Sequence, residues 1–148
     1  MTDSSGEIFT EIVLEIFKVS GMLNSEGDKL TEEFGLSSAR WKIMGAIARS
    51  EQLLTVPQIG RSMGQSRQAT QRLVDVMAKD SLLKLIENPN HKRAKYIDLT
   101  EEGRRIYDEL DEKQKPWALE GANQLTTTEL DAALSALRKM AHHFGNQS

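Results

Sequence analysis

The sequence predicts a mainly helical domain with a small β-wing. Two observations between Thr55 and Thr100 carry this prediction. The first is a capped helix, a turn at Gly64-Gln65, and a second helix that begins at Ser66. The second is a pair of short apolar runs on either side of the polar turn 88–94 (Asn-Pro-Asn-His-Lys-Arg-Ala), which is typical of a hairpin. Together they predict a winged helix-turn-helix.

The composition favours one domain over residues 1–148, a common domain length. The chain has no cysteine, which excludes disulfides and a thiol redox switch. Residues 1–7 carry acidic side chains where a secretory signal carries lysine or arginine. No run of about 18 apolar residues is available to span a membrane. We therefore expect a cytoplasmic protein with no membrane partner.

The charge is unevenly distributed along the chain. The net charge of −3 by itself argues against a nucleic-acid partner. Residues 61–95, however, carry eight lysines and arginines against three acidic residues, a local charge of +5, so the rest carries −8. A basic module in an acidic scaffold presents one face to a polyanion and repels it elsewhere. The plainer alternative is a chance run of charge on a solvated face.

The first helix is expected from about Glu7 to Leu23, because apolar residues recur there at three- and four-residue steps. Gly27-Asp28 is expected to break it. A second helix is expected after Ser37-Ser38, which can cap it, and runs toward Ser50. These two helices lead into the helix-turn-helix.

The helix-turn-helix itself has clear start signals. Thr55 and Gln58 form a capping box that opens a short helix to Met63. The next helix is expected from about Ser66 to Asp80. At 100° per residue, its wheel gathers the apolar residues Ala69, Leu73, Val76 and Met77. The opposite face carries Arg67, Gln68, Gln71 and Asp75, with Thr70 and Arg72 on the flanks. This layout is expected of a recognition helix.

The wing and the last two helices follow. Residues 82–87 and 95–99 are expected to pair as two strands. Thr100 caps the next helix, and Pro116 is expected to kink or end it. A last helix from about Thr126 or Thr127 carries an apolar stripe of Leu130, Leu134, Leu137, Ala141 and Phe144.

The terminal helices, 7–24 and 101–145, expose more apolar surface than a small winged domain can cover. We expect them to pair with a second copy and form a homodimer. The alternative is that they fold back on their own chain. A two-fold dimer also suits double-stranded DNA, because two recognition helices one helical turn apart read a palindrome.

Three segments together resemble the MarR family of bacterial and archaeal transcriptional regulators: 66–75 (SRQATQRLVD), 90–94 (NHKRA) and 99–103 (LTEEG). The resemblance covers nearly the whole chain. It implies an obligate homodimer whose winged helix-turn-helix lobes, residues 37–100 here, are joined by the N- and C-terminal helices. It also implies a repressor that leaves its palindromic operator on binding a small ligand.

Two positions depart from the family pattern. Asn90-His91 stands where an aspartate commonly precedes paired wing arginines, and that acid usually braces the wing arginine. Ser81 stands at the end of the recognition helix, where glycine is frequent, so a left-handed cap costs more free energy there. Neither departure removes the groups that face DNA.

The recognition helix supplies the candidate base contacts. Ser66 and the unpaired backbone N–H groups at the helix start are expected to meet a phosphate, because a helix N-terminus carries partial positive charge. Arg67 suits guanine in the major groove, and Gln68 or Gln71 suits adenine.

Further candidate DNA contacts come from the helix flanks and the wing. Thr70 and Arg72 suit phosphate contacts. Arg93, with Lys92, is expected to enter the adjacent minor groove, where narrow A·T tracts concentrate negative potential. His91 either assists there or is simply solvated.

The sequence also offers candidates for a small-molecule site, but none for a metal or for catalysis. Phe17, Trp41 and Met44 are candidates to line an apolar cavity for an aromatic or lipophilic ligand, the alternative for each being ordinary core. His142-His143 diverge by about 100° on a helix, so no metal site and no cofactor is expected. No nucleophile motif or phosphate loop is present, so no enzyme is expected.

Two alternative functions stay open. One is a winged-helix module that binds DNA without sequence preference or binds protein, against which the glutamines on the recognition helix argue. The other is an enzyme whose site no motif reveals. The operator, the effector and the regulated genes are not identified by the sequence, and repression over activation rests on the resemblance.

Overall fold

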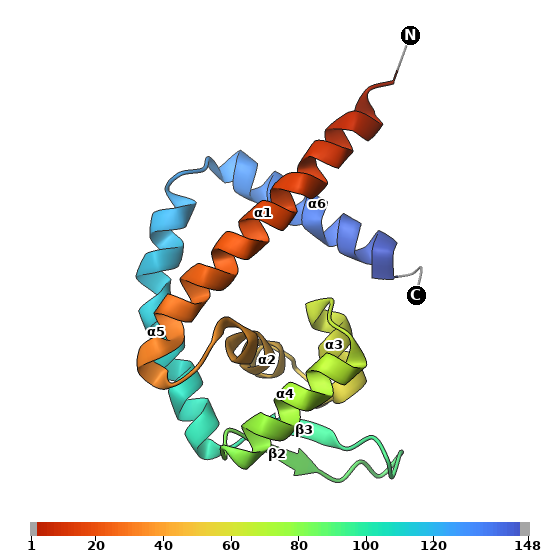
Figure 1. Cartoon of the computed structure of the whole chain (residues 1–148), viewed down its shortest axis with the longest axis vertical. Coiled ribbons are helices and arrows are strands. Elements are labelled where there is room, and N and C mark those ends of the chain that lie inside the picture. Colours follow the sequence, from red (N-terminus) through yellow and green to blue (C-terminus); the bar gives the residue numbers. More distant parts are fainter. Residues whose placement is uncertain (1–2, 146–148) are drawn as a thin grey trace.

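The computed structural model describes residues 3–145. In chain order its elements are α1 (Ser5–Thr31), η1 (Glu32–Phe34), α2 (Ser38–Ala48), β1 (Leu54–Thr55), α3 (Val56–Met63), α4 (Arg67–Lys79), β2 (Leu83–Ile86), β3 (Tyr96–Leu99), α5 (Glu101–Ala122) and α6 (Thr127–Gly145). Figure 1 shows α2, α3, α4 and the strands as a lobe at one end, with α6 and the first part of α1 as arms at the other. The predicted winged helix-turn-helix is confirmed.

The core lies inside the lobe, where α2, α3 and α4 pack against the sheet and the start of α5. Its buried apolar side chains are Ile43, Met44, Ile47, Val56, Ile59, Val74, Met77, Leu82, Leu83, Ile97, Leu99 and Tyr107. Burying each large apolar side chain contributes about 1.5–3 kcal/mol to folding. This close packing fixes the recognition helix relative to the wing.

The sheet has three strands in the order β1-β3-β2, all antiparallel. Leu83 pairs with Leu99 and Ile86 with Tyr96 across the predicted hairpin. β1 was not predicted, because two residues are too few to show a period-2 pattern. It pairs with β3 and leads directly into α3, so the helix-turn-helix is attached to the wing.

The helix-turn-helix forms as predicted at its ends. The Thr55–Gln58 capping box is present, and Gly64 takes the left-handed φ of 65° that ends α3. Ser66 caps α4 by accepting the N–H of Ala69 at 3.1 Å. These local signals position the start of α4.

The inward face of α4 differs from the predicted wheel. Val76 is 44% exposed, and the buried residues are Thr70, Val74 and Met77. Thr70 can take an inward position because its hydroxyl lies 2.8 Å from the carbonyl oxygen of Ser66 and is thereby satisfied. The wheel placed Thr70 on a flank because its apolar face was centred on Ala69, Leu73 and Val76 and left out Val74, which is buried.

α1 is longer than predicted, and the expected break at Gly27-Asp28 is wrong. Gly27 is buried inside the helix, where a β-carbon would collide with Ser38 Oγ. Asp28 accepts the N–H of Ser38 at 2.8 Å. Both residues therefore bring the start of α2 against α1 instead of ending the helix.

The last two helices differ from the sequence prediction at one point. α5 does not end at Pro116 but continues to Ala122. α6 begins with a reciprocal cap, in which the Thr126 N–H donates to Glu129 Oε1 and the Glu129 N–H to Thr126 Oγ1. Between Thr127 and Gly145 no residue is buried, so the apolar stripe of α6 is exposed in the single chain.

Candidate nucleic-acid interface

The N-terminal half of α4 presents four of the predicted DNA contacts to solvent. Arg67, Gln68, Gln71 and Arg72 are all exposed. Ser66, also exposed, keeps its side chain on the Ala69 N–H, so the helix start is capped and still reachable. The arrangement offers hydrogen-bonding side chains beside a helix N-terminus, where anions are favoured.

Thr70 is a correction to the predicted set. Its side chain is fully buried, 2.8 Å from the Ser66 carbonyl oxygen and 3.1 Å from Gln65 Oε1. A phosphate cannot reach this hydroxyl. Thr70 instead holds the turn between α3 and α4 in shape.

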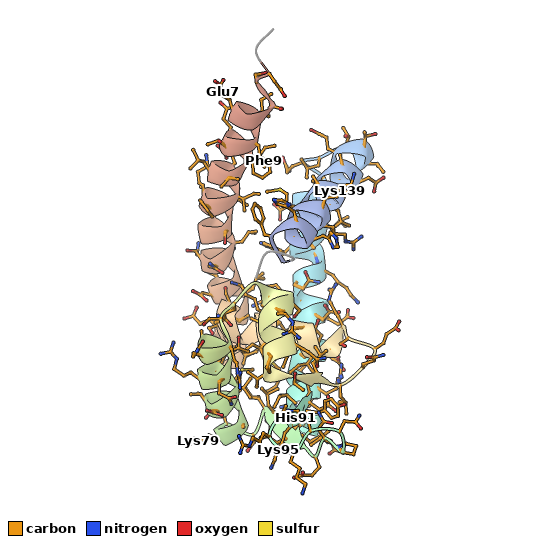
Figure 2. All side chains as sticks on the ribbon, turned by 90° about the vertical axis from the view of Figure 1, so that its right-hand side faces the viewer. Glu7, Phe9, Lys79, His91, Lys95 and Lys139 are labelled. Carbon is orange, nitrogen blue, oxygen red and sulfur yellow. The ribbon has the colours of Figure 1, made fainter. Side chains whose placement is uncertain are left out.

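A groove separates α4 from the wing, with a volume of about 390 Å³. The recognition helix contributes Arg67 and Gln71 to it, and the wing contributes His91, Arg93 and Lys95. Residues more than twenty positions apart in the sequence thus line one cleft. Figure 2 shows Lys79, His91 and Lys95 at the same end of the molecule, away from the arms.

The wing tip is braced by Asn88, which the sequence analysis did not single out. The Asn88 side chain is nearly buried, donates to the Ala94 carbonyl oxygen at 2.9 Å and accepts the Asn90 N–H at 3.0 Å. The Asn-Pro-Asn sequence is a known turn signal that could have identified it.

His91 has a contact that neither predicted alternative included. Its imidazole is exposed, and Nδ1 accepts the Ala94 N–H at 3.1 Å. Asn88 and His91 together close the turn that carries Lys92 and Arg93, both exposed. Asn90-His91 stands where the pattern of the resembled family has an aspartate, and here Asn88 and His91 close the turn without that acid.

The three acidic residues of the basic module each contact another side chain. Asp80 pairs with Arg40 of α2 at 2.9 Å, and Glu87 pairs with Lys95 at 3.4 Å. Asp75 instead accepts a hydrogen bond from Gln71, with 2.9 Å between Gln71 Nε2 and Asp75 Oδ1. The wheel placed Gln71 and Asp75 on one face but did not identify their bond.

A second cavity, of about 340 Å³, lies between α1, α2 and α5. Trp41, one of the three candidate ligand residues, lines it together with Arg49, Tyr107 and Trp117, and its role in binding a ligand stays a prediction. A hydrogen bond with Tyr107 raises the pKa of Arg49, so the guanidinium stays charged.

The other two predicted ligand residues are not in this lining. Met44 is a fully buried core residue, which is the plainer alternative. Phe17 is 68% exposed on α1 and lies outside the lining. The sequence could not identify Tyr107 and Trp117 as cavity residues, because the packing of α5 against α2 brings them there.

Residues 3–145 contain neither a membrane-spanning helix nor a cluster of metal-ligating side chains. None of the described helices is long and apolar enough to cross a membrane. Within the same range, no three histidine, cysteine, aspartate or glutamate side chains cluster as metal ligands would.

A recognition helix, a three-stranded wing and a polar groove between them define a winged-helix DNA-binding protein. Residues 34–94 match the sequence model described as the MarR family. An uncharacterized protein of Mycobacterium tuberculosis is 32% identical over 127 residues, which span 86% of this chain and 85% of that protein. The chain belongs to the MarR family of DNA-binding transcriptional regulators, a family of regulators and not of enzymes.

Other relatives and solved structures agree with this assignment. The transcriptional activatory protein BadR of Rhodopseudomonas palustris is 23% identical, spanning 73% of this chain and 63% of BadR. A MarR/EmrR family regulator of Acinetobacter has a TM-score of 0.82 at 19% identity, covering 95% of this chain and 99% of that one. The structure of CouR of Rhodococcus jostii bound to p-coumaroyl-CoA has a TM-score of 0.78 at 21% identity, covering 88% of this chain and 91% of CouR. The structure of a mutant MarR of E. coli complexed with operator DNA has a TM-score of 0.69 at 22% identity, covering 89% of this chain and 96% of that one.

Proposed function

We propose that this protein represses transcription by binding a palindromic operator as a homodimer in the cytoplasm, and that a small molecule releases it. The groove between α4 and the wing carries the proposal. Its helix wall offers Arg67 and Gln71, and its wing wall offers Arg93 and Lys95. Such a groove supports base readout by the helix together with backbone or minor-groove contacts by the wing.

The helix residues divide by chemistry. Ser66 and the helix start suit a phosphate. Arg67 suits the two acceptors of guanine, and Gln68 or Gln71 suits the donor and acceptor of adenine. Arg72, on the outer face of α4, suits a phosphate contact.

The wing residues act on the neighbouring groove. Lys92 and Arg93 are held at the tip by the turn that Asn88 and His91 close. A guanidinium on such a tip suits a narrow minor groove with strong negative potential. His91 closes the turn, and its exposed ring is then placed to assist Arg93 at the minor groove.

The arms support a homodimer through residues 7–24 and 101–145. Eight large apolar side chains of α1 are exposed: Ile8, Phe9, Ile12, Leu14, Phe17, Val19, Met22 and Leu23. α6 adds Leu130, Leu134, Leu137 and Phe144. A groove of about 670 Å³ with mostly apolar lining runs between α1 and α6. Because the arms do not cover these faces themselves, folding back on the same chain is disfavoured.

A substitution in this groove tests the homodimer. Leu137→Glu places a carboxylate among apolar groove residues and is expected to give a monomer by light scattering after size exclusion. Ser135→Glu, on the same helix but not among the residues that line this groove, is the matched control and should stay dimeric. A wild-type monomer at micromolar concentration contradicts the dimer.

The cavity between α1, α2 and α5 is the proposed effector site. Its volume of about 340 Å³ suits a small aromatic molecule. Trp41 and Trp117, the only two tryptophans in the chain, both line it. Tryptophan fluorescence therefore reports on this cavity alone. CouR, which binds p-coumaroyl-CoA, supports an aromatic ligand.

The decisive experiment compares the upstream intergenic DNA of the gene with a scrambled duplex across a salt series. If a dimer neutralises roughly six to ten phosphates, affinity falls by about 10³ to 10⁵ between 50 and 200 mM salt. Specific binding should exceed scrambled binding by at least about 10³. Equal affinity for both duplexes means a module without sequence preference and overturns the proposal.

Two variants separate the minor-groove contact of the wing from base readout by α4. Arg93→Ala should weaken binding to all duplexes, whereas Gln71→Ala should also relax the choice of base. Lys139→Ala, on α6 at the other end of the molecule, is the control and should change neither (Figure 2). Equal losses on every sequence for both DNA-face variants contradict the assigned roles.

The sign of regulation is tested separately, because it depends on where the operator lies relative to the promoter. The relative BadR is an activatory protein. Transcription from the bound promoter in a purified system should fall when this protein is added and recover with effector. A rise on addition overturns repression and leaves DNA binding intact.

A further inference from the structure

We infer that Asp75 is a positioning residue for base readout, because it orients the Gln71 amide so that α4 prefers adenine to guanine. The inference rests on the proposed function, in which α4 enters the major groove of an operator. It adds to that function a residue that does not itself contact the selected base pair.

The geometry fixes which end of the amide faces Asp75. Gln71 Nε2 donates to Asp75 Oδ1 at 2.9 Å, and both side chains are exposed one turn apart on α4. A carboxylate only accepts hydrogen bonds, so the amide nitrogen, and not the oxygen, turns toward Asp75. Gln71 lines the groove between α4 and the wing. Its Oε1 and its second N–H remain available to DNA.

These two remaining groups complement one base. Adenine presents the N7 acceptor and the N6–H donor in the major groove, which match one N–H and one oxygen. Guanine presents two acceptors, N7 and O6, and would place O6 against the Gln71 oxygen. Without Asp75 the amide nitrogen could turn both of its protons toward guanine.

The charges of the module agree with this role. Asp80 and Glu87 are each paired with a cation, Arg40 and Lys95, whereas Asp75 contacts the neutral amide of Gln71. A carboxylate on the surface that faces phosphates weakens their attraction. Asp75 therefore lowers affinity for DNA in general while sharpening the choice of base.

The test selects bound duplexes from a pool with a randomised 20-base-pair segment, using the full-length wild type, Asp75→Ala and Asp75→Asn. Asparagine keeps an oxygen acceptor for Gln71 Nε2 without the charge. The wild type should enrich adenine over guanine at one position in each half-site. Asp75→Ala should lower that ratio roughly three- to tenfold. The hydrogen bond between Gln71 and Asp75 contributes little free energy in water and more once the DNA excludes water.

Two comparisons distinguish positioning from charge. Both Asp75 variants should bind the unselected pool more tightly, whereas only Asp75→Asn should retain the adenine preference. Gln71→Ala should abolish the preference at the same position, and adding Asp75→Ala should then change it no further. Circular dichroism of each variant checks that α4 is folded.

Several outcomes overturn the inference. The inference is wrong if Asp75→Ala leaves the adenine-to-guanine ratio unchanged. It is also wrong if Asp75→Asn lowers this ratio as much as Asp75→Ala does. An Asp75 effect that persists in the Gln71→Ala background also overturns the inference. In each of these the wild type still selects a sequence, so the proposed function stands. A wild type that enriches no sequence overturns both.

Discussion

The Thr100 hydroxyl, which caps α5, donates a 2.6 Å hydrogen bond to the backbone carbonyl of Ser81, two residues beyond the recognition helix. The same oxygen accepts the Gly103 N–H at 2.9 Å. Arg40 of α2 holds the adjacent Asp80 at 2.9 Å. The end of α4 is thus attached to α2 and α5, the helices that line the proposed effector cavity.

Ser81→Gly should stabilise the protein. Ser81 has a φ of 63° in a left-handed cap, in which the Leu82 N–H reaches the Met77 carbonyl oxygen at 2.9 Å. This conformation costs an L-residue about 1 kcal/mol, and glycine adopts it freely. Chemical denaturation should show a gain of up to about 1 kcal/mol. Ser81→Ala, which keeps the strain, is the control, and an equal gain from alanine contradicts the explanation.

Gly27→Ala should destabilise the protein, against the helix propensity of alanine. A β-carbon there collides with Ser38 Oγ and lies 3.2 Å from Ser38 Cβ. The crowding should lower the free energy of unfolding by about 1–3 kcal/mol. Thermal melts of the wild type and the variant, at equal protein concentration, provide the measurement.

Two further variants isolate this crowding. Gly21→Ala, in the same helix with open space around it, should stabilise by about 1 kcal/mol. In a Ser38→Ala background the penalty of Gly27→Ala should shrink, since the colliding oxygen is absent. Additive effects of the two substitutions argue against the contact.

Asn88→Ala should weaken DNA binding without unfolding the lobe. It removes the bonds to the Ala94 carbonyl and the Asn90 N–H, each worth about 1 kcal/mol, so the wing tip loosens. Affinity for the operator should fall roughly tenfold by fluorescence anisotropy, and amide exchange should rise at the tip. Asn90→Ala, which keeps the Asn90 N–H, serves as the control. Similar losses from both variants indicate a direct contact instead.

The start of α6 should become less stable in acid. Hydrogen bonds from Thr126 lower the pKa of Glu129 from its ordinary value of 4.5. A lowered folded-state pKa gives stability above pH 4.5 that is lost as the pH falls through the lowered value. The protection of the Thr126 amide against exchange, measured relative to the intrinsic exchange rate at each pH, should therefore fall as the pH drops below 4.5. Glu129→Gln should remove this pH dependence, and its persistence rules out the carboxylate.

Most of the fold could be predicted because its signals are local. The Thr55–Gln58 box, Gly64 and the Ser66 cap each act within four residues, and they set the ends of α3 and the start of α4. The continuation of α1 through Gly27 could not be predicted. Glycine usually weakens a helix, and here the lack of a side chain at Gly27 admits Ser38 of α2, eleven residues later in the chain.

The candidate DNA interface likewise contains residues that the sequence predicted and one whose position it did not predict. The outward side chains Arg67, Gln68, Gln71 and Asp75 were predicted, because helical geometry alone sets their common face. The burial of Thr70 was not predicted, because it depends on hydrogen bonds from the Thr70 hydroxyl to Ser66 and Gln65. The predicted DNA roles of the outward residues stay predictions.

The sequence by itself determined the order of the α-helices and of the two wing strands β2 and β3, but not β1. It also determined the basic module and the resemblance to the family, since periodicity, capping and charge are local properties of the chain. Tertiary structure decided which residues share a cavity. Trp41 meets Tyr107 and Trp117 only because α2 packs against α5, whereas Met44 turns into the core. Likewise Arg67 meets Arg93 across one groove only because β3 pairs with β2 and holds the wing beside α4. Such contacts depend on packing between distant segments, which no local pattern encodes.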